Sequence, residues 1–193
     1  MILRKAALRP VPAHAVVDTH TLHAMEASLD DDDDSLQDIL DRGFNDLDRR
    51  QPAVAQHLAD HLARTADELV QSLGYFLVVT IHMAFREQFP TRLVEVDDSA
   101  LDIARATLEA DEELRANDPT EVLDSDDVLA LSQPAVLQYI QHHVDEALEQ
   151  ADGEIDLDEL DRIYRALLVE VIALSHAVKS PTGELGPTPD MLA

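Results

Sequence analysis

Apolar residues recur every three or four positions through the middle of the chain, the spacing that gathers them on one face of an α-helix. One such stripe begins after Ser35, and a second begins after Pro52, a residue that suits the first turn of a helix because its missing N–H costs nothing there. We therefore expect two amphipathic helices. Their apolar positions are Leu36, Ile39, Leu40, Phe44 and Leu47 in the first, and Val54, Leu58 and Leu62 in the second.

The next segment is apolar nearly all round, which predicts the central helix of the fold over residues 66–88. Thr65 and Glu68 have the spacing of a capping box at its start, and Pro90 marks its end. Its longest apolar stretch, residues 73–85, has 13 residues and falls short of the roughly 18–20 that a membrane span needs. We expect a buried helix and no membrane span.

Three further helices are predicted downstream, with no strand signal anywhere. They cover residues 99–116 with Ser99 as the cap, 134–151 opened by Pro134, and 157–178, with a weaker helical segment over 121–131. The sequence thus predicts an all-α bundle of about six to seven helices. The expected inward positions are Leu101, Ala104, Leu108 and Leu114 in the first of these helices, and Leu160, Ile163, Leu167, Val171 and Leu174 in the last.

Both ends of the 193-residue chain lack this periodicity. Residues 1–34 contain prolines, three histidines and a run of five aspartates, and residues 180–193 are rich in proline and glycine. We predict flexible tails at 1–34 and 180–193 around one domain at 35–179. The basic start lacks the apolar core of a secretory signal, so we expect a cytoplasmic protein.

A short sequence occurs twice. Gln-Pro-Ala-Val stands at residues 51–54 and again at 133–136, and six of the twelve residues from each glutamine are identical. Tyr75 and Tyr164 also correspond if the second copy carries a seven-residue insertion, which adds two helical turns and keeps the apolar face in phase.

The repeat predicts a pseudo-twofold arrangement of two halves, about 35–95 and 96–179, which share one core because neither can bury its apolar face alone. Two unrelated helices that share a proline start are the alternative. A half-bundle could also pair with a second chain, so a homodimer is a further alternative.

The net charge is -26, and it is unevenly distributed. Residues 93–161 hold 22 acidic side chains against Arg105 and Arg115 alone. Such a surface repels phosphate backbones and anionic lipids, which argues against nucleic acid and membrane as partners, and it attracts basic protein surfaces. A merely solvated acidic face is the plainer interpretation.

Four histidines form the one candidate metal site: His57, His61, His82 and His143. His57 and His61 are four residues apart and share a helix face, and His143 is the repeat counterpart of His61. Inward histidines could hold a transition metal in a bundle core. No histidine has a glutamate three residues earlier, as di-iron bundles require, so ordinary core histidines without a cofactor are the preferred interpretation.

Two further motifs match metal-binding patterns only in part. Residues 57–61 resemble an inverted zinc-protease pattern with Asp60 in place of glutamate, and residues 152–159 match only the second half of a calcium-binding EF-hand loop. For the latter, a helix stop at Gly153 followed by an Asp156/Glu159 capping pair explains the same residues.

No motif assigns a reaction. The chain has no cysteine, no phosphate-binding glycine loop and no catalytic serine motif, and no catalytic residue can be named. The leading hypothesis is a non-enzymatic acidic helical protein that binds a basic protein partner through its acidic surface. A metal-binding bundle is the alternative.

Overall fold

A computed structural model describes residues 11–29, 35–116, 132–151 and 155–181, apart from the side chains of 111 and 114–116. These residues form seven α-helices and one 3-10 turn, with no named strand among them. The predicted all-α class is confirmed. The elements are the turn Ala13–Ala15, α1 (Thr19–Leu29), α2 (Leu36–Arg50), α3 (Pro52–Leu62), α4 (Glu68–Gln88), α5 (Asp98–Ala116), α7 (Pro134–Gln150) and α8 (Leu157–His176).

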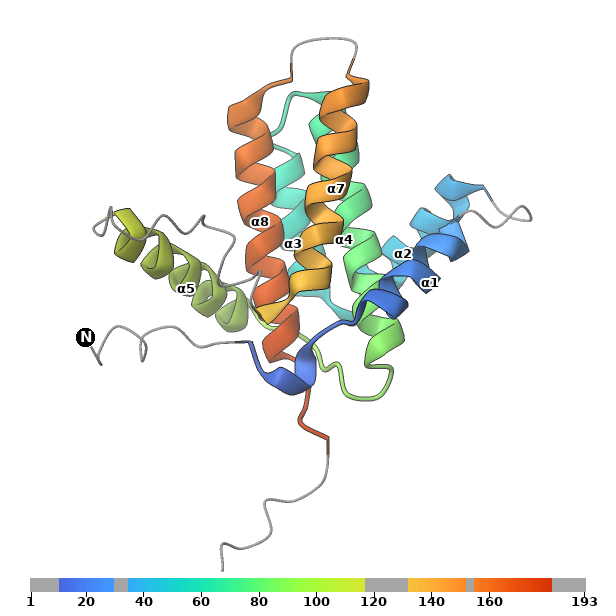
Figure 1. The fold of residues 1–193 in the computed structure, drawn as a ribbon, viewed down its shortest axis with the longest axis vertical. Coiled ribbons are helices and arrows are strands. Elements are labelled where there is room, and N and C mark those ends of the chain that lie inside the picture. Colours follow the sequence, from blue (N-terminus) through green and yellow to red (C-terminus); the bar gives the residue numbers. More distant parts are fainter. Residues whose placement is uncertain (1–10, 30–34, 117–131, 152–154, 182–193) are drawn as a thin grey trace, which may run out of the picture.

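Four helices make the centre of the bundle, and the others flank it. Figure 1 shows α3, α4, α7 and α8 side by side, with α5 on one side and α1 and α2 on the other. The closest packing joins α5 to α8, α4 to α8 and α2 to both α3 and α4. Large side chains with less than 2% exposure fill the interior, so one core serves all the helices: Leu47, Leu77, Phe85, Phe89, Ile140, Ile163, Leu167 and Leu174.

The helix starts differ from prediction at two places. Asp67, rather than Thr65, caps α4, since its Oδ1 accepts from the backbone N–H groups of Leu69 and Val70. Asp97, rather than Ser99, plays this role for α5 through a 2.8 Å bond from the Ala100 N–H. In both helices an aspartate stands beside the expected hydroxyl residue and caps equally well. Leu36, predicted inward, is 47% exposed, and the predicted 121–131 segment lies outside the described residues.

The segment 66–88, predicted to form the central helix, is largely buried. By length and composition, α4 is long and apolar enough to cross a membrane, but 61% of its most apolar stretch is buried inside the protein. Helices α1, α2, α3, α7 and α8 all pack on it. This is the pattern of a core helix.

Residues 11–29, predicted to lie in a flexible tail, are packed on the bundle. Ala15 and Val17 are fully buried, Leu22 and Met25 are nearly so, and α1 contacts α4 and α7. The prediction was wrong here because the segment is too short for a clear periodicity. Its order comes instead from hydrogen bonds to residues far along the chain.

A buried glutamine makes the first of these bonds. Gln133, which precedes α7, accepts from the Val17 N–H through Oε1 at 3.0 Å and donates to the Ala15 carbonyl through Nε2 at 2.7 Å. Its side chain therefore holds an extended segment much as a neighbouring strand would. Nε2 also lies 2.9 Å from the hydroxyl of Ser175.

Gln51, which precedes α3, makes the matching contacts. It accepts from the Val96 N–H at 2.7 Å and donates to the Val94 carbonyl at 2.9 Å. Gln51 and Gln133 have nearly identical backbone angles and are both at most 2% exposed. We call the segments that these glutamines hold the clamped segments. Each is followed directly by an aspartate that caps the next helix, Asp18 for α1 and Asp97 for α5.

The N-termini of α4 and α8 also meet. Asp67 accepts from the backbone N–H of Asp156 at 3.1 Å, and Glu159 accepts from the N–H groups of Ala66 and Asp67 at 2.9 Å each. Asp156 caps its own helix, as predicted, through the N–H groups of Asp158 and Glu159. Glu159, predicted as its capping partner, instead bonds the neighbouring helix.

We predict that Gln133→Ala and Gln51→Ala each lower the free energy of unfolding by about 2–5 kcal/mol. Gln133→Ala leaves a buried N–H and a buried carbonyl without this partner, and Gln51→Ala leaves a buried N–H and the half-buried carbonyl of Val94 without theirs. A buried group without a partner costs about 1–3 kcal/mol. Urea unfolding measures the loss. Amide exchange should quicken at Val17 in the first variant and at Val96 in the second.

The control is Gln138→Ala, because Gln138 is exposed on α7. It should change stability by no more than about 0.5 kcal/mol. Equal losses in all three variants would contradict the clamping role.

Candidate functional site: a cationic pocket between α3, α5 and α8

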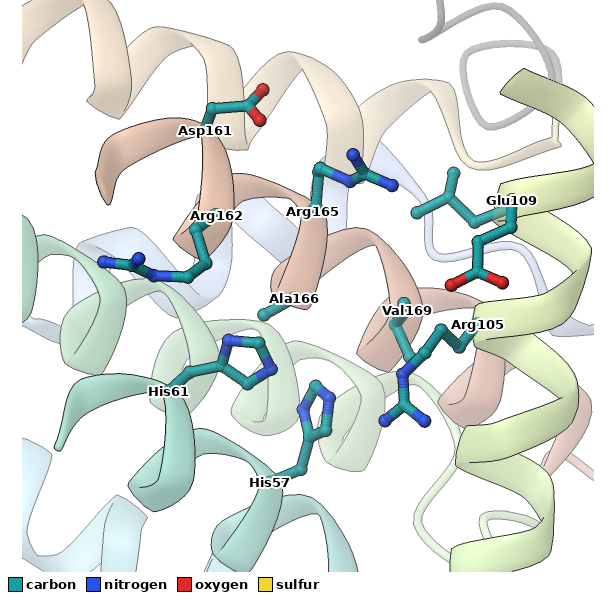
Figure 2. Close-up of a pocket in the computed structure, with 10 residues that line it drawn as sticks. His57, His61, Arg105, Glu109, Asp161, Arg162, Arg165, Ala166 and Val169 are labelled. Carbon is teal, nitrogen blue, oxygen red and sulfur yellow. The ribbon is translucent and has the colours of Figure 1, made fainter. Parts of the chain in front are cut away.

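One pocket gathers charged side chains from three helices. It has a volume of about 260 Å³ and lies between α3, α5 and α8. Figure 2 shows two histidine rings from α3 beside one another, with arginines projecting from α5 and α8. We call it the cationic pocket; it is lined by His57, His61, Arg105, Leu108, Glu109, Asp161, Arg162, Arg165, Ala166 and Val169.

Helical spacing explains why these residues meet. His57 and His61 are one turn apart on α3, and Arg105, Leu108 and Glu109 share a face of α5. On α8, residues 162, 165, 166 and 169 follow the same rule. Because α8 packs against both α3 and α5, these three faces close around one space.

A buried contact between His57 and Glu170 lies behind one wall of the pocket. His57 Nδ1 lies 2.8 Å from Oε1 of Glu170, which is 2% exposed on the inner face of α8. Burial raises the pKa of Glu170, and the adjacent His57 acts in the opposite direction. Because this contact occupies Nδ1, Nε2 is the nitrogen of His57 that remains for a ligand.

His61 lies next to His57, with ring centroids 4.6 Å apart. Burial, and then the charges of His57 and nearby arginines, lower the pKa of His61 to about 4. Its ring is therefore neutral at neutral pH. Its buried Nδ1 has no hydrogen-bond partner among the described residues.

Among the described residues, each arginine of the pocket pairs with one carboxylate. Arg165 lies 2.6 Å from Glu112, Arg105 lies 2.8 Å from Asp102, and Arg162 lies 3.4 Å from Glu159. A guanidinium has five N–H donors, so a single carboxylate leaves several available. The Nε of Arg162 is buried and makes no hydrogen bond within the described part of the chain.

The other two histidines of the predicted metal set lie in different surroundings. His82 is fully buried on α4, and neither of its ring nitrogens has a described partner. His143, on α7, packs its ring against Phe76 and Tyr139. Across the described residues, no group of three or more His, Cys, Asp or Glu side chains is arranged to hold a metal. Of the predicted set, only His57 and His61 are adjacent by ring contact.

The weaker motifs have structural explanations where they are described. Asp60 is exposed and accepts a 2.8 Å bond from the Gln56 side chain on its own helix. In the EF-hand-like stretch, Asp156 and Glu159 bond backbone N–H groups at helix starts. Residues 152–154, with the Gly153 stop, lie outside the described ranges.

A second cavity lies between α1 and α7, with a volume of about 350 Å³. Its described lining contains no arginine or lysine, and it includes the carboxylate of Glu26. The two cavities therefore differ sharply in charge. Its lining is Thr19, Leu22, His23, Glu26, Ala135, Gln138, Tyr139 and His142.

Sequence reasoning found the two histidines of the cationic pocket but not its arginines or Glu170. Two signals were present. Glu170 is the one charged residue between positions 166 and 175, and Arg105 is one of two basic residues among 22 acidic ones in 93–161. A charge that interrupts its surroundings in this way indicates a specific contact.

No family model, curated protein or solved structure matches this chain.

We predict that His82 makes the protein less stable in mild acid. Burial lowers the pKa of His82 to about 4, from an unfolded value of 6.5. As the pH falls from 6.5 towards 4, the unfolded chain takes up this proton and the folded protein does not, so stability is lost. The loss is on the order of 3 kcal/mol. His82→Leu should remove this part of the pH dependence, as measured by urea unfolding at pH 7 and in mild acid.

The control is His20→Leu, because His20 is exposed on α1. It should keep the pH dependence of the parent protein. If His82→Leu loses as much stability in acid as the parent does, burial of a neutral His82 is not the cause.

Proposed function

We propose that this is a non-enzymatic, cytoplasmic interaction protein that binds a basic protein partner through an acidic surface. The observation that carries the proposal is a concentration of exposed carboxylates near the end of α7 and the start of α8. Figure 1 shows that these two helix ends lie together at one end of the bundle. We call this the acidic end; its exposed members are Asp145, Glu146, Glu149, Asp156 and Asp158.

The position of these acids on α7 supports a role beyond stability. The C-terminus of a helix carries a partial negative charge, so acidic side chains near it are unfavourable and basic ones are preferred. The last turn of α7 contains no basic residue, while Asp145, Glu146 and Glu149 approach it. Charges that act against the helix dipole are expected where another molecule uses them.

The acids are also available for contact. Asp145, Glu149 and Asp158 make no ion pair with any described basic side chain, and Glu146 lies 3.6 Å from His143 and 3.5 Å from the side-chain amide of Gln150. A basic surface could therefore approach without first breaking strong internal pairs. Long-range attraction would speed its association, with a rate that falls as salt rises.

The test uses a short oligolysine peptide and two matched double variants. Asp145→Asn/Glu149→Gln changes the acidic end, whereas Asp48→Asn/Glu87→Gln removes the same charge from α2 and α4, where both residues are also exposed. We expect the first to weaken binding about fivefold more than the second, since nearby exposed charges contribute about 0.5 kcal/mol each.

Fluorescence anisotropy across a salt series measures the affinity, which should fall as salt increases. If both double variants lose the same affinity, binding follows total charge and has no preferred end. If binding is independent of salt, the partner does not recognise the acidic surface.

We also propose that the two halves arose by duplication and are related by a pseudo-twofold axis. The reciprocal clamps support this, because Gln51 holds a segment before α5 and Gln133 holds one before α1. The packing pairs agree: α1 contacts α4 and α7, and α5 contacts α8 and α3.

Contacts between corresponding residues give independent support. With the seven-residue insertion, Asp67 corresponds to Asp156 and Gly74 to Ile163. Residues on a twofold axis touch their own counterparts, and these do: Asp67 accepts from the Asp156 N–H, and Gly74 packs on Ile163. On this view each half begins before its clamped segment, so that α1 belongs to the first half.

The duplication proposal predicts that the halves depend on each other. Fragments separated at residue 91 should each be unfolded alone, because α3 packs across α8 and α7 across α4, and they should recover helical circular dichroism when mixed. Cooperative melting of either isolated fragment would contradict the shared core.

A further inference from the structure

The cationic pocket is the feature that an acidic interaction surface leaves unexplained. In a chain with 14 basic and 40 acidic residues, three arginines from two helices line one space together with two histidines. Scattered over the surface, those arginines would offset the negative charge equally well. Their placement around one pocket calls for a local reason.

We infer that the cationic pocket binds a small organic anion, a molecule that carries a carboxylate or phosphate group on a short apolar body. The polar groups that would hold the anion are Arg105, Arg162 and Arg165; the carboxylates of Glu109 and Asp161 also line the pocket. Arginine suits both groups, since its planar fork donates two parallel hydrogen bonds to one anion.

The arginines of the pocket have N–H donors that their pairs with carboxylates do not use. Each arginine meets one carboxylate among the described residues, and the partners of Arg105 and Arg165, Asp102 and Glu112, lie on α5. Glu170 orients the ring of His57 from behind, as an outer carboxylate does for a ligand-binding histidine. An anion in the pocket would therefore meet positioned groups.

The remaining wall explains the apolar body. Leu108, Ala166 and Val169 line the same space, and all three side chains are largely buried. A mixture of an apolar wall with a few convergent polar groups is typical of small-molecule sites. A volume of about 260 Å³ suits a small molecule rather than a peptide segment.

The cavity between α1 and α7 provides a contrast within the same molecule. If the proposed duplication holds, Arg105 corresponds to Glu26, Arg162 to Leu73 and Arg165 to Phe76. Every arginine of the pocket thus has an acidic or apolar counterpart. Of these three counterparts, only Glu26 lines the cavity between α1 and α7.

Isothermal titration of the full chain with benzoate and with phenyl phosphate tests the inference. Both probes carry an anionic group on an apolar ring, and the tighter one identifies the group that the pocket prefers. We expect saturable binding of at least one, and no saturable binding of benzyl alcohol, which has the ring without the charge.

Arg105→Gln should weaken that binding about tenfold, the loss expected when a charge-assisted hydrogen bond is removed. Arg165→Gln should do the same, and it guards against an effect peculiar to one position. Arg49→Gln is the control, because it removes the same charge from an exposed arginine on α2; it should leave the affinity within about twofold. Circular dichroism and melting establish that each variant is folded.

Three results would overturn the inference: no saturable binding of either anion, equal losses in Arg49→Gln and Arg105→Gln, or benzyl alcohol binding as tightly as benzoate. The oligolysine experiment is independent of all three, because it concerns the opposite charge on the acidic end. A failure of either proposal therefore leaves the other standing.

Discussion

The close crossing of α4 and α8 is the contact on which the rest of the structure depends. Gly74 makes it close: a Cβ there would lie 2.9 Å from the Ile163 side chain and 3.2 Å from that of Leu62. A larger residue would push these two helices apart. Their N-termini are also tied together by Asp67, Asp156 and Glu159. This crossing sets how α3 lies across α8, and hence whether His57 reaches Glu170.

The spacing of apolar residues along the chain predicted the helices and much of their buried faces. The segments after Pro52 and Pro134 became α3 and α7, with Val54 and Leu58 buried on α3 as expected, and the segment predicted to be central packs against α1, α2, α3, α7 and α8. It did not predict order in residues 11–29, because that segment is held by Gln133, 116 residues away from Val17 in sequence. A repeated Gln-Pro marked the clamp, but nothing local to the glutamine names the segment that it binds.

The cationic pocket shows the same limit more sharply. Arg162 and Arg165 occupy positions on α8 that any solvated helix face would offer, and their meaning depends on α5 lying beside them. The spacing of apolar residues within a helix does not reveal which other helix packs beside it. Glu170 was visible in sequence as a charge within an apolar stretch, yet its partner His57 lies 113 residues earlier. A charge within an apolar stretch marks such a residue in the sequence, but only the fold shows which residue it contacts.

Charge segregation links the two proposals. A protein of net charge -26 repels small anions at long range, so an anion site in it must act at short range, in a recess where low polarity strengthens each contact. The cationic pocket offers such a recess, because Glu112, Asp102 and Glu159 pair with its arginines while the buried His57, the half-buried His61 and the apolar wall line the same space. The acidic end needs the opposite condition, exposed and unpaired charge whose field extends into solvent. Long-range attraction of a basic partner and short-range capture of an anion are thus compatible on one small bundle, since different distances govern them.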